Sequence, residues 1–468
     1  MNMLRVIAPL SVLVCAVSTQ AQPAALDYGA AWQQLLGRSE RLAAARSASE
    51  GKAQQAQGLR YFGGPTVGVS GAYAAYHAAL TVDLSSVNDK LGELDQHLPV
   101  PLENLPIPLP VPQLPPRYTY SRDDTIATAS ISAVAPLYLG GAADAVRGFA
   151  DAQAAEARAD ERQTEHQLSS LLAQRYFGAQ LARRAAALRT QALATVEQHD
   201  RAAEKLLANG AIARVERLQA SAALDEARRN ARKAQSDAEL AERALASLLA
   251  NPQPVAPSSP LFVQSEPLPP MNGFVDQALL AHPGLAKVGA KKAQAEHLHE
   301  AAEGLRKPQV FAFAQRELRS GDQANWVAGI GARWTLFSSL DHGALDAASA
   351  AQVEQARHSD AQARADIALL VERQWRAAEQ ARQAYLSMDT AIALADEIVH
   401  LRSVGLREGT STPLERIEAD VNLAKAQTER AQVAYEYVTA LAGLYEACGR
   451  PEGFAEALAR ADIRIPNP

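Results

Sequence analysis

Two turns, 199 residues apart in the chain, carry acidic residues whose spacing could act on ions. In Gly405–Gln427, Glu415 and Glu418 are three residues apart, so on a helix they share a face. A ring of such carboxylates around an opening would favour cations and resist anions through its local field. Glu415 has a second interpretation, because it completes a T-x-x-E capping box with Thr412. The two roles do not exclude each other, and Glu418 has no capping role.

The earlier turn, in Leu207–Arg228, repeats this pattern. Aligning its Gly210 with Gly409 pairs Glu216 with Glu415, and the apolar positions that follow also match. The constant offset indicates an internal duplication, in which each copy of the turn joins two helices.

Other groups of residues do not fit a known chemistry. His297 and His299 are flanked by glutamates, but an H-x-H spacing directs the two rings about 200° apart on a helix, and no H-E-x-x-H occurs. Gly329 and Gly331 lack the third glycine and the following helix of a dinucleotide-binding loop. No nucleophile triad or Walker sequence is present. We therefore expect no metal, no cofactor and no enzymatic activity.

Composition and the first residues indicate export. The 468 residues carry a formal net charge of -6, which by itself says nothing about nucleic acid, but no basic domain stands out and we expect no nucleic-acid partner. Arg5, the apolar run Val6–Val17 and Thr19–Ala21 form a signal peptide over residues 1–21. The alternative is lipidation at Cys15, which the large Val14 before it disfavours. After the signal, Cys448 is the only cysteine and no run of about 18 apolar residues occurs, so we expect neither an internal disulfide nor a transmembrane helix.

The same order of elements is predicted in each half of the chain. The first half begins with a helix, Leu26–Leu59, followed by two strands, Thr66–Asp83 and Thr125–Ala135, which are separated by the Pro-rich segment Leu98–Arg117. A long helix, Ala142–Ala208, comes next, and another helix follows the Gly210 turn. The second half comprises Gly273–Leu305, Gln309–Arg319, Trp326–Leu336, Ala344–Arg407 and a helix after Pro413. We interpret the Pro-rich segment as a stiff surface loop rather than a peptide-recognition site. The predicted boundaries are 1–21 signal, 22–250 first repeat, 251–270 Pro/Ser-rich linker, 271–450 second repeat and 451–468 C-terminal tail.

The lengths and patterns of the helices predict a layered assembly. A helix of about 67 residues would span about 100 Å, and small residues at heptad spacing mark coiled-coil seams. In each half, two shorter helices placed end to end would match one long helix. Each half can therefore form a layer with a strand pair at one end.

The strands predict that several chains share one barrel. Four strands cannot close a barrel, and an open sheet in lipid would leave backbone groups unpaired. Trp326 and Trp334 fall on one face of a strand, roughly 27 Å apart, about the height between the aromatic girdles of a membrane barrel. Three chains would supply twelve strands. Alternation alone is also consistent with a half-buried sheet in a soluble protein.

With these features, the sequence resembles the TolC-type outer-membrane efflux protein family (outer membrane factors) over essentially all of its mature length. The resemblance lies in the duplicated order of elements, in the junction Pro136–Gly141 (PLYLGG), and in the repeated turn. It implies a homotrimer in the cell outer membrane, in contact with outer-membrane lipid and extending into the periplasm. Such a protein is the exit duct of a tripartite efflux pump or a type I secretion system, passing small molecules or proteins, with a periplasmic adaptor and an inner-membrane transporter as partners.

The resemblance also implies roles for single residues. Glu415, Glu418 and Glu216 match acidic positions at the periplasmic aperture. Leu406 and Ser411 stand where other members have a tyrosine and an arginine that latch neighbouring helices, and Arg214, Arg407 or Arg416 could substitute as salt-bridge partners at the aperture.

The expected fold class is therefore α+β: a trimeric β-barrel with four strands per chain, continued by a long α-helical coiled-coil barrel, with internal duplication. The alternative is a secreted or periplasmic coiled-coil scaffold or adaptor without channel activity. An adaptor would have one helical hairpin between halves of a small β domain, whereas here the hairpin and the strand pair both occur twice.

Overall fold

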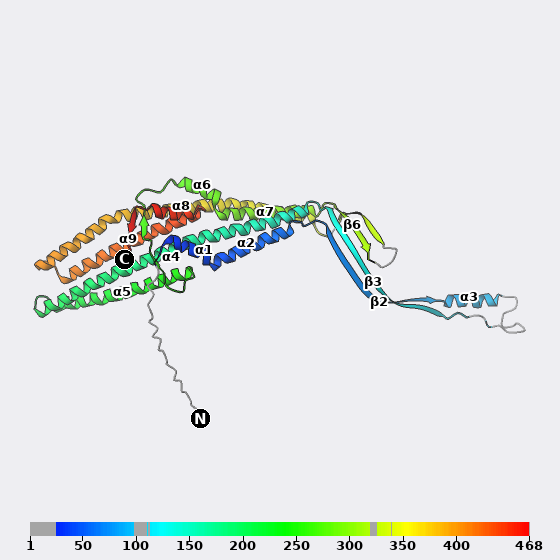
Figure 1. Cartoon of the computed structure of the whole chain (residues 1–468), viewed down its shortest axis with the longest axis horizontal. Helices are drawn as coiled ribbons and strands as arrows, with labels where there is room; N and C mark the ends of the chain where they lie inside the picture. Colours follow the sequence, from blue (N-terminus) through cyan, green and yellow to red (C-terminus); the bar gives the residue numbers. More distant parts are fainter. Residues whose placement is uncertain (1–24, 98–109, 111–112, 319–324, 338, 468) are drawn as a thin grey trace, which may run out of the picture. The chain divides into compact units, whose positions relative to one another are not determined.

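The structure is a computed structural model, and it describes residues 25–97, 110, 113–318, 325–337 and 339–467 (Figure 1). The predicted signal peptide, Cys15 and most of the Pro-rich segment lie outside the described residues. The chain divides into two compact units. The helical unit contains residues up to Arg60, Arg147–His299 and the residues from Ala347 onward; the strand unit contains Tyr61–Val146 and Glu300–Asp346.

Long helices make up most of the helical unit (Figure 1). The helices are α1 (Tyr28–Arg38), α2 (Glu40–Leu59), α4 (Ala142–Ala208), α5 (Arg214–Leu248), α6 (Met271–Ala281), α7 (Pro283–Gly304), α8 (His342–Glu408), α9 (Pro413–Ala447) and α10 (Glu452–Arg460). Helices α4 and α8 both have 67 residues, and α5 and α9 both have 35. Among the described helices, none is both long and apolar enough to cross a membrane.

Two helices predicted as continuous are each broken in the structure. Leu26–Leu59 divides at Ser39, whose hydroxyl accepts from the backbone N–H of Leu42 at 3.3 Å and caps α2. Gly273–Leu305 divides at His282, whose Nδ1 accepts from the backbone N–H of Gly284 at 3.0 Å at the start of α7. Each new helix end exposes backbone donors, and a side chain at the break satisfies one of them.

The core of the helical unit is a cluster of aromatic rings. The ring centroids of Tyr28 and Tyr176 lie 5.5 Å apart, and Tyr28 and Phe454 lie 5.1 Å apart. Phe177 and Phe262 are fully buried and also meet edge to face, at 5.9 Å. These rings come from α1, α4, α10 and residues 261–263, so the core joins segments from far apart in the chain.

The predicted linker 251–270 folds into this core. Its two short strands, β4 (Ala256–Pro257) and β5 (Leu261–Val263), pair with β1 (Ala25–Leu26) and β8 (Ile463–Ile465). The hydroxyl of Tyr176 donates to the carbonyl of Leu26 at 2.6 Å and accepts from the backbone N–H groups of Ser258 and Ser259. The segment is therefore structural. The segment predicted as a C-terminal tail, 451–468, likewise contains α10 and β8 in its described part, and Phe454 and Ile465 are buried there.

The strand unit contains a four-stranded sheet in which every neighbouring pair is antiparallel. In spatial order the strands are β2 (Thr66–Asp83), β3 (Arg117–Tyr138), β6 (Gln309–Glu317) and β7 (Trp326–Arg333). Strand β2 has the predicted bounds, β3 is longer than predicted at both ends, and β7 ends three residues earlier than predicted. An unpredicted helix, α3 (Ser85–Gln96), follows β2.

The pairing register assigns each side chain of this sheet to one of two faces, because directly opposed residues point the same way. Face one carries Val67, Val69, Ile131, Ala133, Ala314, Trp326, Ala328 and Ile330. Face two carries Thr66, Ser70, Ser130, Ser132 and Gln315, together with Phe311 and Phe313, whose rings cover Gly331 and Gly329. At this end of the sheet, face one is apolar on all four strands except for Arg316, which lies opposite Ile131 and Trp326, whereas face two is mostly polar.

Candidate functional site at the helical turns

The two repeated turns have the same backbone conformation. Gly210 and Gly409 have φ values of 71° and 75°, a left-handed conformation that glycine adopts at little cost. Beside them, the N–H of Ala211 donates to the carbonyl of Leu206, and that of Thr410 donates to Gly405, both at 2.8 Å. The glycines thus end α4 and α8 in the same way.

The second turn is closed by side chains. The predicted capping box is confirmed: the N–H of Glu415 donates to the Thr412 hydroxyl at 3.2 Å, and the N–H of Thr412 donates to Glu415 Oε2 at 3.1 Å. Arg402 of α8 also donates from Nη1 to Glu415 Oε2, at 3.0 Å. Glu415 is therefore engaged by both helices. Arg402 was not among the arginines expected to pair with the acidic residues of the turns.

Glu418 is the more available of the two predicted aperture carboxylates. Its side chain is exposed, and among the described residues it makes no ion pair. It lines a groove of about 640 Å³ between α5 and α9, in which Ile417 and Val421 supply apolar surface. Arg189, Arg229 and Glu226 also line this groove, so Glu418 lies in a charged surrounding.

The first turn has the corresponding acid but fewer contacts. Glu216 is half-buried in the first turn of α5, and the N-cap residue there, Ala213, has no side chain that could accept a hydrogen bond. Arg214 and Arg407 are exposed, and within the described part of the chain neither pairs with a carboxylate.

A charged cluster that sequence reasoning missed connects the two hairpins. Asp420 Oδ2 lies 3.1 Å from Nε of Arg416 and 3.1 Å from Nε2 of His199 on α4. The exposed fractions of the Asp420, Arg416 and His199 side chains are only 12%, 15% and 17%. The Arg416 guanidinium also donates from Nη1 to the carbonyl of Val399. The i,i+4 spacing of Arg416 and Asp420 was a signal in the sequence, whereas the contact with His199 had none.

Apolar packing surrounds this cluster. Val196 and Ala203 from α4, Ala220 and Leu224 from α5, and Ile417 from α9 form a small buried core. An ion pair between Arg217 Nη1 and Asp200 Oδ1, at 2.6 Å, lies within the first hairpin. The two hairpins of one chain are therefore held together near their turns by both apolar and charged contacts.

The predicted interface aromatics lie in the strand unit. Trp326 begins β7 on face one and is 73% exposed. Trp334 lies one residue beyond the end of β7, and its indole N–H donates to the carbonyl of Arg306 at 3.1 Å. The two tryptophans thus do not share one strand, and their role at a membrane interface stays a prediction.

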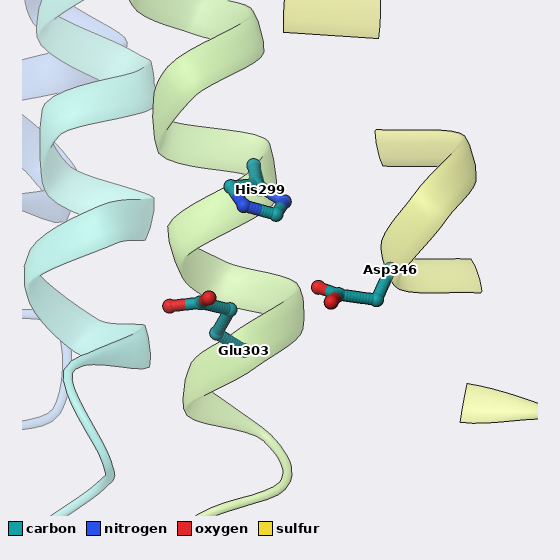
Figure 2. Close-up of side chains that lie close together, drawn as sticks. All are labelled: His299, Glu303 and Asp346. Atoms are coloured by element: carbon teal, nitrogen blue, oxygen red, sulfur yellow. The ribbon is translucent and has the colours of Figure 1, made fainter. Parts of the chain in front are cut away.

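The two histidines weighed as metal ligands point in different directions. The ring of His297 packs against Gly148 of α4, whereas His299 Nδ1 lies 2.7 Å from the Ser349 hydroxyl on α8. Figure 2 shows His299 with Glu303 on α7 and Asp346 on α8. His299 belongs to the helical unit and the two carboxylates belong to the strand unit, so we assign no metal site to them.

Comparisons with known proteins identify the fold. No family model and no curated protein matches the sequence. Solved structures do match it. A structure of CusC, described for folding and transmembrane channel formation, superposes with a TM-score of 0.75 at 15% identity, over 92% of this chain and 96% of that one. The Campylobacter jejuni CmeC outer membrane channel gives 0.73 at 14%, over 98% of both chains. The open state of the Neisseria gonorrhoeae MtrE outer membrane channel gives 0.71 at 17%, over 91% of this chain and 89% of that one. The chain therefore has the fold of these outer-membrane channels, the TolC-type fold that its sequence resembles.

Proposed function

We propose that three copies of this chain form an exit duct in the outer membrane, with a twelve-stranded barrel continued by a helical tunnel into the periplasm. The single observation that carries the proposal is the strand unit's sheet. Within the described chain it has two open edges, β2 and β7, and one face that is apolar on all four strands apart from Arg316. An isolated open sheet with such a face would be unstable in lipid and prone to association in water.

The strand directions support closure by further copies. Each strand is antiparallel to its neighbour, so the first and fourth strands, β2 and β7, run in opposite directions. The β7 edge of one copy can therefore pair with the β2 edge of the next, and a head-to-tail contact of this kind closes into a ring. In the closed barrel, face one would meet lipid and face two would line the lumen.

The helical unit supports a tunnel built from similar hairpins. The equal lengths of α4 and α8, and of α5 and α9, are what an internal duplication would produce. Three copies would place six such hairpins around one axis. A periplasmic adaptor and an inner-membrane transporter are the proposed partners, in a tripartite efflux pump or a type I secretion system.

At the narrow end of the tunnel, we assign the ion-selective role to Glu418 rather than Glu415. Glu415 already serves as a cap and pairs with Arg402, whereas Glu418 is exposed. Three copies of Glu418 would form a ring of negative charge. Glu216 would add a second acidic position from the first turn.

Export and assembly are tested first. Membrane fractionation should place the mature protein in the outer membrane, and amine-reactive crosslinking in detergent should give trimers. A protein that stayed soluble in the periplasm as a monomer would contradict the duct and favour the coiled-coil scaffold.

Selectivity is tested in planar bilayers. Glu418→Ala should lower cation selectivity and block by divalent cations, and should do so more than Glu415→Ala. Glu429→Ala is a matched control, because Glu429 is an exposed glutamate on the same helix, away from the turn. Unchanged selectivity in the double variant Glu415→Ala, Glu418→Ala, with trimers intact, would remove both residues from the aperture.

A further inference from the structure

The β2–β3 hairpin is much longer than the rest of the sheet (Figure 1). Strand β6 pairs with β3 only from Ser130 to Tyr138, whereas β2 and β3 continue for thirteen more residue pairs, the last twelve of which run from Ala72–Thr128 to Asp83–Arg117. No other strand of the described chain flanks these pairs, which we call the free ribbon. A two-stranded ribbon alone is marginally stable in water. We therefore expect another surface to pack against the free ribbon, and the side chains on its two faces indicate the kind of surface.

Face one changes character on the free ribbon. Near the base of the hairpin it carries Val67 and Val69, but farther along it carries polar cross-strand pairs. His77 Nδ1 lies 2.6 Å from Asp123 Oδ1, the hydroxyls of Thr81 and Thr119 lie 3.2 Å apart, and Arg117 Nε lies 3.9 Å from Asp83 Oδ2. In the proposed barrel, this change marks the level at which face one leaves the hydrocarbon and meets water.

Face two changes in the opposite sense. Near the base it carries Ser70 and Ser130, whose hydroxyls lie 3.0 Å apart. On the free ribbon it carries large apolar and aromatic side chains that are exposed in one chain: Tyr76, Leu80, Val82, Tyr118, Tyr120 and Ile126. Leu80 lies directly opposite Tyr120, and Val82 lies directly opposite Tyr118. This face would point towards the barrel axis.

The charges on face two suit contact with identical copies. Its only ionised groups on the free ribbon are Arg122 and Asp124, and Arg122 Nη2 lies 2.7 Å from Asp124 Oδ2. Each ribbon therefore neutralises its own charges on this face. Three copies could approach one another there without like-charge repulsion.

We propose that face two of the free ribbon is a contact between copies, through which three ribbons lean together over the outer mouth of the barrel and narrow it. This inference rests on the proposed trimeric duct and is continuous with its barrel contact. Twelve residues extend about 40 Å. Twelve strands about 4.8 Å apart and tilted about 40° give a barrel radius of only about 12 Å. The ribbons are long enough to meet at the axis, where Leu80, Val82, Tyr118 and Tyr120 would pack together.

Disulfide crosslinking tests the contact. With a mild oxidant, Tyr120→Cys should yield disulfide-linked dimers within the trimer, because identical face-two residues approach each other around the axis. Ser121→Cys is the matched control, since Ser121 is the exposed neighbour on face one. We expect at least fivefold more crosslinked product for Tyr120→Cys. Cys448 remains in place in both variants, because burial raises the pKa of its thiol to about 12.

The outcomes separate this inference from the proposed function. Trimers without a crosslink at Tyr120→Cys would overturn the mouth contact and leave the duct standing; this is the result expected if the chain's own Pro-rich segment or a foreign protein covers face two. Equal crosslinking of both variants would also overturn it. Failure to form trimers would overturn both proposals.

Conductance tests the narrowing. Replacing Leu80, Tyr118 and Tyr120 together by serine should raise single-channel conductance at least 1.5-fold, whereas Thr119→Ala with Ser121→Ala should leave it unchanged. An unchanged conductance in the triple-serine variant would overturn the narrowing.

Discussion

Each of the two helical turns has an arginine at the same position of the repeat, but the two arginines make different contacts. Arg217 and Arg416 are 199 residues apart and occupy equivalent positions, and each reaches back to the equivalent position of its long helix, Asp200 or Val399. In the first hairpin the arginine finds a carboxylate there. In the second it finds only a backbone carbonyl, and it pairs with Asp420, which also contacts His199 of the first hairpin.

The turns differ in their caps as well. The N-cap residues Ala213 and Thr412 have nearly the same backbone conformation, with ψ of 155° in both, but only Thr412 caps with its side chain. The first turn thus keeps its charged contact within the hairpin, whereas the second joins the hairpins. Equivalent backbone positions have thus acquired different roles through single side chains.

Among the variants of the turns, loss of the Asp420 carboxylate should lower the free energy of unfolding the most. Asp420→Ala leaves Arg416 and His199 without their carboxylate and should lower the free energy of unfolding by about 3 kcal/mol, since breaking a buried pair strands a charge. Asp200→Ala strands only Arg217, which is more exposed, and should cost about 2 kcal/mol. Denaturant unfolding followed by circular dichroism, at fixed protein concentration, measures both. A larger cost for Asp200→Ala would reverse the assignment of the inter-hairpin role.

Replacing the glycine of either turn should destabilise the protein by a similar amount. Gly210→Ala and Gly409→Ala should each cost about 1–2 kcal/mol, because an added Cβ is strained at positive φ. An added Cβ would meet nothing within 4 Å beyond the adjoining backbone at either site, so the strain is in the backbone alone. Asparagine, which tolerates this conformation, should cost less at both positions. A large difference between the two alanine variants would contradict the shared turn geometry.

The N-cap can be removed from the second turn and introduced into the first. Thr412→Ala should cost about 1 kcal/mol. Ala213→Thr should stabilise the protein by about 0.5–1 kcal/mol, because Glu216 already stands at the position that completes a capping box. Thermal unfolding with Ala213→Val as control separates the hydroxyl from the added volume. No gain over the valine variant would show that the first turn cannot accept a cap.

Substitutions at the two helix breaks, Ser39 and His282, should change stability the least, and only the break at His282 should make it depend on pH. Burial lowers the pKa of His282, so protonation favours the unfolded chain. Its stabilising contribution is therefore present above the usual histidine pKa of about 6.5 and is lost as the pH falls below it. His282→Asn keeps a capping acceptor and should flatten the pH dependence of the unfolding midpoint between about pH 7 and pH 5. Ser39→Asn, at the non-titrating break, should leave that dependence unchanged.

Elements with strong local signals could be predicted from the sequence. Helix α4 was predicted with its observed bounds, because Gly140, Gly141 and Gly210 surround a run of strong helix formers. The capping box was predicted because its two residues, Thr412 and Glu415, are only three positions apart in the sequence. The break at His282 had a signal that was overlooked, since Pro283 is a typical first helical residue.

The remaining features depend on contacts between distant residues. Strands β5 and β8 are three residues each, and Leu261 pairs with Ile465, so neither strand has a periodic pattern long enough to detect. Likewise, nothing near Asp420 in the sequence indicates His199. The cap was therefore predictable, whereas the contact between the hairpins was not.

The aromatic core sets an order of events during folding. Tyr28 packs against Phe454, more than four hundred residues later, so a nascent chain cannot close this core until nearly all of it has been synthesised. Throughout that interval the strands around Val67 and Trp326 are already present without their final surroundings. Contacts so distant in sequence form slowly, and the unprotected strand edges are vulnerable to aggregation in the meantime. A chaperone that holds the strands apart would therefore act before the helices finish packing.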